Sequence, residues 1–206
     1  MQPVSDFDRI ASNIAIWHDY DSAVKAELYS TCLGTPDGTY LVDPILLERE
    51  ALYELIGSNS VMGIIVTNGN HHRASATFAE KFSAPLFGRT EAFLNKVARE
   101  LKGVTDGDEI SEALTVIGIE GAADGEIALH YAPHEGTFII GDALINFAPY
   151  GFTFLPAKYC SNQKQMRRSL GKLLAYKAER MFFAHGTPIL SEAIERLRGL
   201  LHSRGG

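Results

Sequence analysis

The chain has 206 residues, of which 46% are hydrophobic and 21% are charged, and its formal net charge is -6. This composition is typical of a globular protein and excludes a disordered or fibrous chain. The acidic balance argues against binding to a nucleic-acid backbone, as does the lack of any Lys/Arg run longer than Arg167-Arg168. The length fits one domain, or two closely joined halves.

Neither a secretory leader nor a membrane span is expected. The first residues include Asp6, Asp8 and Arg9 where a leader needs a continuous apolar core, and no later apolar stretch has the length of a bilayer span. We therefore expect a soluble, cytoplasmic protein. The two cysteines, Cys32 and Cys160, have no C-x-x-C spacing, and we expect both as small buried side chains rather than a disulfide or a zinc site.

Apolar stretches alternating with turns predict antiparallel strands early in the chain, and strands alternating with helices later. The continuous apolar run 61–66 is typical of a strand buried on both faces. It leads into the polar stretch 67–73 and then a helix, which makes a strand, loop and helix unit. The expected strands are 14–17, 26–32, 39–42, 61–66, 85–87, 114–119, 127–131, 137–140 and 181–184, and the expected helices are 46–56, 74–83, 90–101, 163–177 and 190–201.

Three polar segments follow expected strands: Thr67-Asn68-Gly69-Asn70-His71-His72-Arg73, Gly141-Asp142 and His185-Gly186. In this order and at these separations they resemble the signature of the metallo-β-lactamase superfamily. In that family a strand ending in Thr leads into His-x-His-x-Asp-His, and later strands end in Gly-Asp and in His-Gly. Two further segments are similar to the family: Tyr40-Leu41-Val42-Asp43 resembles its early strand, and the segment 169–173 resembles the helix before its last motif.

The resemblance spans nearly the whole chain. It implies a single metallo-β-lactamase-like domain over residues 1–206, of mixed α/β (α+β) class and built as a four-layer αββα sandwich. In such a fold the ligands of one or two divalent ions lie on loops at strand ends, and the bound ions generate a hydroxide nucleophile.

Few of the family's metal ligands carry over to this sequence. Asn68 and Asn70 stand where the family has its first two histidines. His72 stands in place of its aspartate, and Arg73 in place of the histidine that follows. The family's next histidine corresponds to Ala122. Because two carboxamides and a methyl group cannot replace three imidazoles, the first metal position of the family should be empty.

The bridging carboxylate and the last histidine of the family do carry over, as Asp142 and His185. Together with His72 they would make a set of two histidines and one carboxylate, which suits one open Fe, Mn or Zn site. The resemblance thus implies a hydrolase of esters, thioesters, lactones or phosphoesters. Its catalytic groups would be Asp142 and His72 at the metal, with Asn70 or Arg73 donating to the developing oxyanion.

A second interpretation stays open, because a guanidinium is always charged and pairs with carboxylates. Arg73 would then neutralise Asp142, and the chain would hold no metal. It would be a non-catalytic module that binds a partner or a small anion.

Structural roles also remain open for the loop: Asn68 to Asn70 suit a tight turn, and His71 and His72 suit an exposed loop. No nucleophile elbow, phosphate loop or dinucleotide fingerprint occurs, which disfavours a serine hydrolase or a nucleotide enzyme. The expected partner is a small-molecule substrate or anion, with neither nucleic acid nor membrane, and a homodimer stays open.

Overall fold

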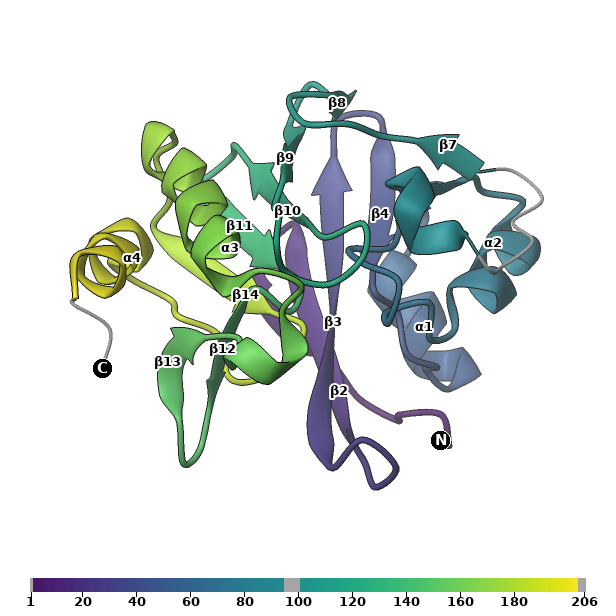
Figure 1. Cartoon of the computed structure of the whole chain (residues 1–206). Helices are drawn as coiled ribbons and strands as arrows, with labels where there is room; N and C mark the ends of the chain where they lie inside the picture. Colours follow the sequence, from purple (N-terminus) through teal and green to yellow (C-terminus); the bar gives the residue numbers. More distant parts are fainter. Residues whose placement is uncertain (1, 95–100, 204–206) are drawn as a thin grey trace. The chain divides into compact units, whose positions relative to one another are not determined.

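A computed structural model of the chain describes residues 2–94 and 101–203. The chain divides into two compact units, Met1–Val104 and Thr105–Gly206. Each unit combines a β-sheet with helices, which is the mixed α/β class expected from the sequence (Figure 1). That residues 1–206 act as a single domain stays a prediction.

The first unit contains a seven-stranded sheet in which the strands follow one another in chain order. The first four strands pair antiparallel through tight turns, as expected for the strands near 14–17, 26–32 and 39–42, and the last four pair parallel. Parallel neighbours need crossover connections, and helices α1 and α2 lie in two of them. The elements are β1 (Asp8–Ala11), β2 (Ile14–Asp21), β3 (Ala26–Thr35), β4 (Gly38–Val42), α1 (Arg49–Ile56), β5 (Val61–Ile65), α2 (Ser75–Phe82), β6 (Leu86–Gly88) and β7 (Leu101–Gly103).

Apolar side chains of both helices join the buried core of this sheet. Leu52 and Leu55 of α1 and Phe78 of α2 are buried there with Ile64 of β5. Trp17 is 1% exposed, and its indole nitrogen donates to the Ile45 carbonyl at 2.9 Å, so its polar atom is satisfied inside the core. Burying side chains of this size contributes about 1.5–3 kcal/mol each, which keeps the strand ends in a fixed arrangement.

The second unit contains a five-stranded sheet in the order β14, β11, β10, β9, β8, and a separate hairpin of β12 and β13. All neighbours in the larger sheet are antiparallel except β11 and β14, which are parallel. The strands are β8 (Glu109–Ser111), β9 (Leu114–Gly118), β10 (Ile127–Tyr131), β11 (Thr137–Ile140), β12 (Leu144–Phe147), β13 (Gly151–Phe154) and β14 (Arg180–Phe183).

Two helices complete this unit, α3 (Gln163–Leu170) and α4 (Ala193–His202). The Asn162 side chain caps α3 by accepting a hydrogen bond from the Gln165 backbone nitrogen. Met166 and Leu170 of α3 and Leu197 of α4 are fully buried in the core that also includes Phe138 of β11.

Several expected boundaries were wrong. The helix expected over 163–177 ends at Leu170 and continues as a 3-10 helix, Gly171–Ala175, because glycine is a poor helix former. The segment expected as a helix over 90–101 begins as a 3-10 turn, Thr90–Phe93, and Leu101 already belongs to β7. The rest of that expected helix, 95–100, lies outside the described residues. No helix within 2–94 and 101–203 has the length and apolar character required to cross a membrane.

The two cysteines differ in exposure, and both are free thiols. Cys32 is 6% exposed, as expected, and burial raises the pKa of its thiol to about 12. Cys160 is only partly buried, so the expectation of two buried thiols was half wrong. Burial also raises the pKa of Cys160.

We expect iodoacetamide at pH 8 to alkylate Cys160 before Cys32 in the folded protein, because the reactive thiolate must form and be reached by the reagent. Peptide mass mapping over time checks the order. In Cys160→Ser, labelling should become negligible until denaturant is added. Labelling of Cys32 first would contradict this difference in burial.

Candidate functional site

Polar residues gather where the parallel strands β4 and β5 end. Val42 pairs with Ile65 in the parallel register, and the Asp43 backbone nitrogen donates to the Ile65 carbonyl at 2.9 Å. Asp43 and Thr67 therefore lie at the same edge of the sheet. The Thr67 backbone nitrogen donates to one oxygen of the Asp43 carboxylate at 2.8 Å, and its hydroxyl donates to the other at 2.5 Å.

The loop after β5 brings His71 to the same carboxylate. Asn68 turns the chain: its side-chain oxygen accepts from the Asn70 backbone nitrogen, and its carbonyl accepts from the His71 backbone nitrogen. His71 Nδ1 then lies 3.0 Å from Asp43 Oδ2 and 2.9 Å from Thr67 Oγ1. Because the Thr67 hydroxyl hydrogen points to Asp43, Nδ1 must carry the hydrogen in both contacts. In the neutral ring the lone pair is then on Nε2, the atom that would bind a metal ion or a proton.

Asp43 is held as a buried anion by its surroundings. Burial alone raises the pKa of its carboxyl group, but the charges of His71 and Arg73 and the hydrogen bonds from His71 and Thr67 lower it more, so the net pKa lies below the usual value. Arg73 Nη1 donates to the Tyr29 carbonyl at 2.5 Å and to the Asp43 carbonyl at 2.9 Å. The backbones of Asp43 and Arg73 both have positive φ, 46° and 39°, which costs residues other than glycine about 1–3 kcal/mol each. The network therefore maintains a strained loop.

A second polar pair forms in the other unit, again from residues that follow two parallel neighbouring strands. Ile140 of β11 pairs with Phe183 of β14 in parallel, and the Ala184 backbone nitrogen donates to the Ile140 carbonyl at 2.9 Å. Asp142 and His185 follow these strands at one edge of the sheet. His185 Nε2 lies 3.4 Å from Asp142 Oδ1, and the two side chains are 16% and 12% exposed.

The separation within this pair suits two ligands of one metal ion. Charge-assisted hydrogen bonds between nitrogen and oxygen are shorter, about 2.7–2.9 Å. Two ligand atoms each about 2.0–2.1 Å from a tetrahedral ion lie about 3.4 Å apart. Asp142 and His185, 3.4 Å apart, therefore match the spacing of a shared ion better than that of a direct strong hydrogen bond.

The remaining expected site residues lie in the loop of the first unit. His72 Nε2 lies 2.8 Å from the Ala92 carbonyl, to which it donates, and its ring packs edge-on against Phe93. Asn70 is exposed on this loop. The structure thus brings together Asp142 and His185 in one unit, whereas a metal site that also includes His72, and an ion pair of Arg73 with Asp142, stay predictions.

Sequence reasoning missed the roles of Asp43, Thr67 and His71. The available signal was positional: Asp43 and Thr67 each directly follow an expected strand. If those strands are parallel neighbours, the two side chains must lie at the same edge.

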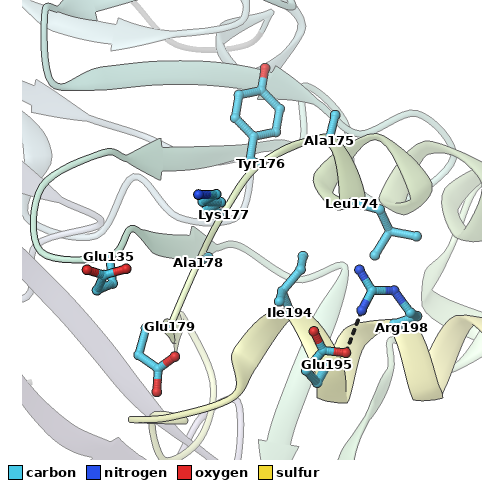
Figure 2. Close-up of a pocket in the computed structure, with 10 residues that line it drawn as sticks. All are labelled: Glu135, Leu174, Ala175, Tyr176, Lys177, Ala178, Glu179, Ile194, Glu195 and Arg198. Carbon is cyan, nitrogen blue, oxygen red and sulfur yellow. Dashed lines mark hydrogen bonds and ion pairs between the residues drawn. The ribbon is translucent and has the colours of Figure 1, made fainter.

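A hollow of about 360 Å³ lies at the opposite ends of β11 and β14 (Figure 2). Glu135 precedes β11, and Glu179 precedes β14. Figure 2 shows Glu195 and Arg198 of α4 paired on its other side. None of its ten lining residues is a histidine, cysteine or aspartate. The hollow offers three glutamates but no imidazole or thiolate, so it lacks the mixed nitrogen and oxygen ligands that Asp142 and His185 provide.

Comparisons with known proteins agree with the architecture. The model of the metallo-β-lactamase superfamily matches residues 9–203. Among solved structures, the chain is similar to the metallo-β-lactamase DIM-1, with a TM-score of 0.77 and 13% identity over 98% of this chain and 99% of that one. It is also similar to a metallo-β-lactamase family protein from Thermus thermophilus, with a TM-score of 0.68 and 20% identity over 93% and 80%.

A metallo-β-lactamase from Erythrobacter litoralis is similar as well, with a TM-score of 0.71 and 16% identity over 95% of each chain. No protein with a curated description matches significantly. At these identities the structural likeness shows the fold alone, and it confirms the metallo-β-lactamase-like fold expected from the sequence.

We expect Asp43→Asn to lower the free energy of unfolding by about 3 kcal/mol, because it replaces a buried carboxylate with a carboxamide and leaves the donors of Thr67 and His71 without matched acceptors. Urea unfolding followed by circular dichroism measures the change. The exposed Asp8 provides the control, and Asp8→Asn should change stability by less than about 0.5 kcal/mol. Equal effects of the two substitutions would contradict a buried anion at Asp43.

The free energy of unfolding of the wild type should depend on pH more strongly than that of Asp43→Asn. A carboxyl group whose pKa is lower in the folded state binds fewer protons there, so its stabilisation is full above the unfolded pKa and is lost as pH falls through the folded pKa. The difference in free energy of unfolding between the wild type and Asp43→Asn should therefore become smaller as the pH is lowered. A gap that stays constant into acid would contradict this assignment.

Proposed function

The chain belongs to the metallo-β-lactamase superfamily, and we propose on that basis that it is a metal-dependent hydrolase with a reduced site for at most one metal ion. The observation that carries the proposal is the pair of Asp142, which is buried, and His185, which is partly buried, with His185 Nε2 and Asp142 Oδ1 3.4 Å apart. A bound divalent ion would supply a hydroxide nucleophile near neutral pH. The proposal includes a cytoplasmic location and a small ester, thioester, lactone or phosphoester as substrate.

The proposed metal ligands are Asp142, His185 and, from the sequence resemblance, His72. His71 is the alternative third ligand, because a carboxylate that accepts the Nδ1 hydrogen is the usual way to orient a metal-binding imidazole. His72 has a comparable orienting partner in the Ala92 carbonyl. In both histidines one ring nitrogen donates a hydrogen bond to an oxygen, which leaves the other nitrogen for a metal ion. Substituting each histidine in turn distinguishes between them.

Asn70 and Arg73 are the proposed donors to the oxyanion that develops on the substrate. A guanidinium fixed by two backbone carbonyls keeps its position without reorganising, which is what makes such a donor effective. Asn70 is exposed, and its carboxamide can donate to a substrate oxygen.

The alternative function is a non-catalytic module of the same fold that binds a partner or a small anion and holds no metal. Two observations favour it. Arg73 is a fixed cation. Ala122, at one of the family's histidine positions, is 2% exposed within the apolar core. In this case the guanidinium of Arg73 would supply the positive charge in place of a metal ion and would pair with Asp142.

Metal analysis separates the two functions. Protein purified without chelator should carry about one equivalent of Zn, Fe or Mn per chain, and His185→Ala should lose it while keeping the circular dichroism of the wild type. The control is His18→Ala, because His18 is an exposed histidine of β2. Parallel analysis of His71→Ala and His72→Ala identifies the third ligand.

Unchanged metal content in His185→Ala would remove the proposed site. Metal-free wild-type protein whose stability falls in Asp142→Asn would instead support the non-catalytic module, because that substitution leaves a cation without its partner.

A further inference from the structure

Helix α3 borders a hollow of about 210 Å³ that is lined by Asn162, Lys164, Gln165 and Arg168. Two of these side chains are cations, and the other two are carboxamides, so all four can donate hydrogen bonds. None is acidic and none is apolar. A cavity lined in this way suits a ligand that presents several acceptor oxygens and negative charge.

The hollow lies in a markedly basic part of an acidic chain. Residues 157–178 contain six Lys or Arg residues and no Asp or Glu: Lys158, Lys164, Arg167, Arg168, Lys172 and Lys177. By contrast, the chain as a whole has a formal net charge of -6. The positive charge on this segment is therefore local and is not a general property of the surface.

The two cations in the hollow differ from their neighbours, several of which already have partners. Lys172 pairs with Asp106 at 3.0 Å, and Arg167 lies over the Phe154 ring and donates to the Ser203 carbonyl. Within the described parts of the chain, no carboxylate pairs with Lys164 or Arg168, and both are exposed. At a spacing of four residues they lie on one face of α3, where like charges repel each other. A bound anion would remove that repulsion.

The backbone that carries the side chains of the hollow is held in place by several contacts. The Asn162 side-chain oxygen accepts from the Gln165 backbone nitrogen at 3.1 Å, which leaves its NH₂ group for donation. The Asn162 backbone nitrogen donates to the Gly121 carbonyl at 2.9 Å. A Cβ at Gly121 would lie 2.3 Å from the Asn162 carbonyl oxygen, so this close approach requires glycine. Met166, on the opposite side of the helix, is fully buried. The helix start therefore keeps its position, which lowers the part of the entropic cost of binding that comes from ordering the backbone.

We propose that this hollow binds a phosphate group, either as inorganic phosphate or as the phosphate of a small monoester. Phosphate at neutral pH carries up to two negative charges, which match Lys164 and Arg168, and its oxygens can accept from both carboxamides. The guanidinium can bind two phosphate oxygens at once. The site requires neither the metal nor the chemistry proposed for Asp142 and His185.

Isothermal titration of the chelator-treated protein with inorganic phosphate tests the proposal, at constant ionic strength set with chloride. We expect saturable binding with one site per chain. Lys164→Gln and Arg168→Gln should each weaken it about tenfold, the loss of one charge-assisted hydrogen bond. The control is Arg196→Gln, which removes the same charge from an exposed residue of α4 and should leave binding unchanged.

Absence of saturable binding to the wild-type protein would overturn the proposal, as would an equal loss in Arg196→Gln. Binding of acetate as tight as that of phosphate would also overturn the proposal, because the hollow would then not select phosphate over a carboxylate. Methyl phosphate distinguishes the two sources: binding at least as tight as that of inorganic phosphate supports a monoester, and weaker binding supports the free ion. Because the protein is metal-free in this assay, failure here leaves the hydrolase proposal standing.

Discussion

Parallel pairing of neighbouring strands is the constraint on which both polar clusters depend. Residues that leave two parallel strands in the same direction emerge at one edge of the sheet, however far apart they are in the chain. Asp43 and Thr67 meet in this way after β4 and β5, and Asp142 and His185 meet after β11 and β14. The apolar cores hold these strands, so the strand ends stay in place, and the polar residues then stabilise the loops that follow them by hydrogen bonds to one another.

The cluster around Asp43 and the pair of Asp142 and His185 contain similar chemical groups but differ in burial and in hydrogen bonding. The carboxylate of Asp43 is 2% exposed and receives hydrogen bonds from both polar groups of Thr67 and from His71. A carboxylate saturated in this way orients its neighbours and has little capacity for chemistry. Asp142 is nearer to solvent, and its contact with His185 is longer than a strong hydrogen bond. The first cluster therefore positions a loop, whereas the second has the character of a ligand pair.

Sequence patterns predicted much of the fold because hydrophobic periodicity is local. Strands 127–131 and 137–140 were predicted with the right ends, since both are apolar and almost wholly buried. Strands β1 and β8 were missed because each has only three or four residues, and none of them is fully buried, so neither shows a clear alternation. The contact of His71 with Asp43 could not be predicted, because it spans 28 positions and depends on the strand register and on the turn at Asn68.

The residues that the sequence resemblance aligns with the family's histidines stabilise the structure of this chain. Asn68 is fully buried, and its side chain forms the turn that directs His71 to Asp43. Arg73 ties the same loop to two backbone carbonyls, and Ala122 fills space in the apolar core. An imidazole in place of any of them would lose these contacts or would overfill the core. Hydrogen bonds and apolar packing therefore stabilise the chain at the positions that the sequence resemblance aligns with the family's histidines.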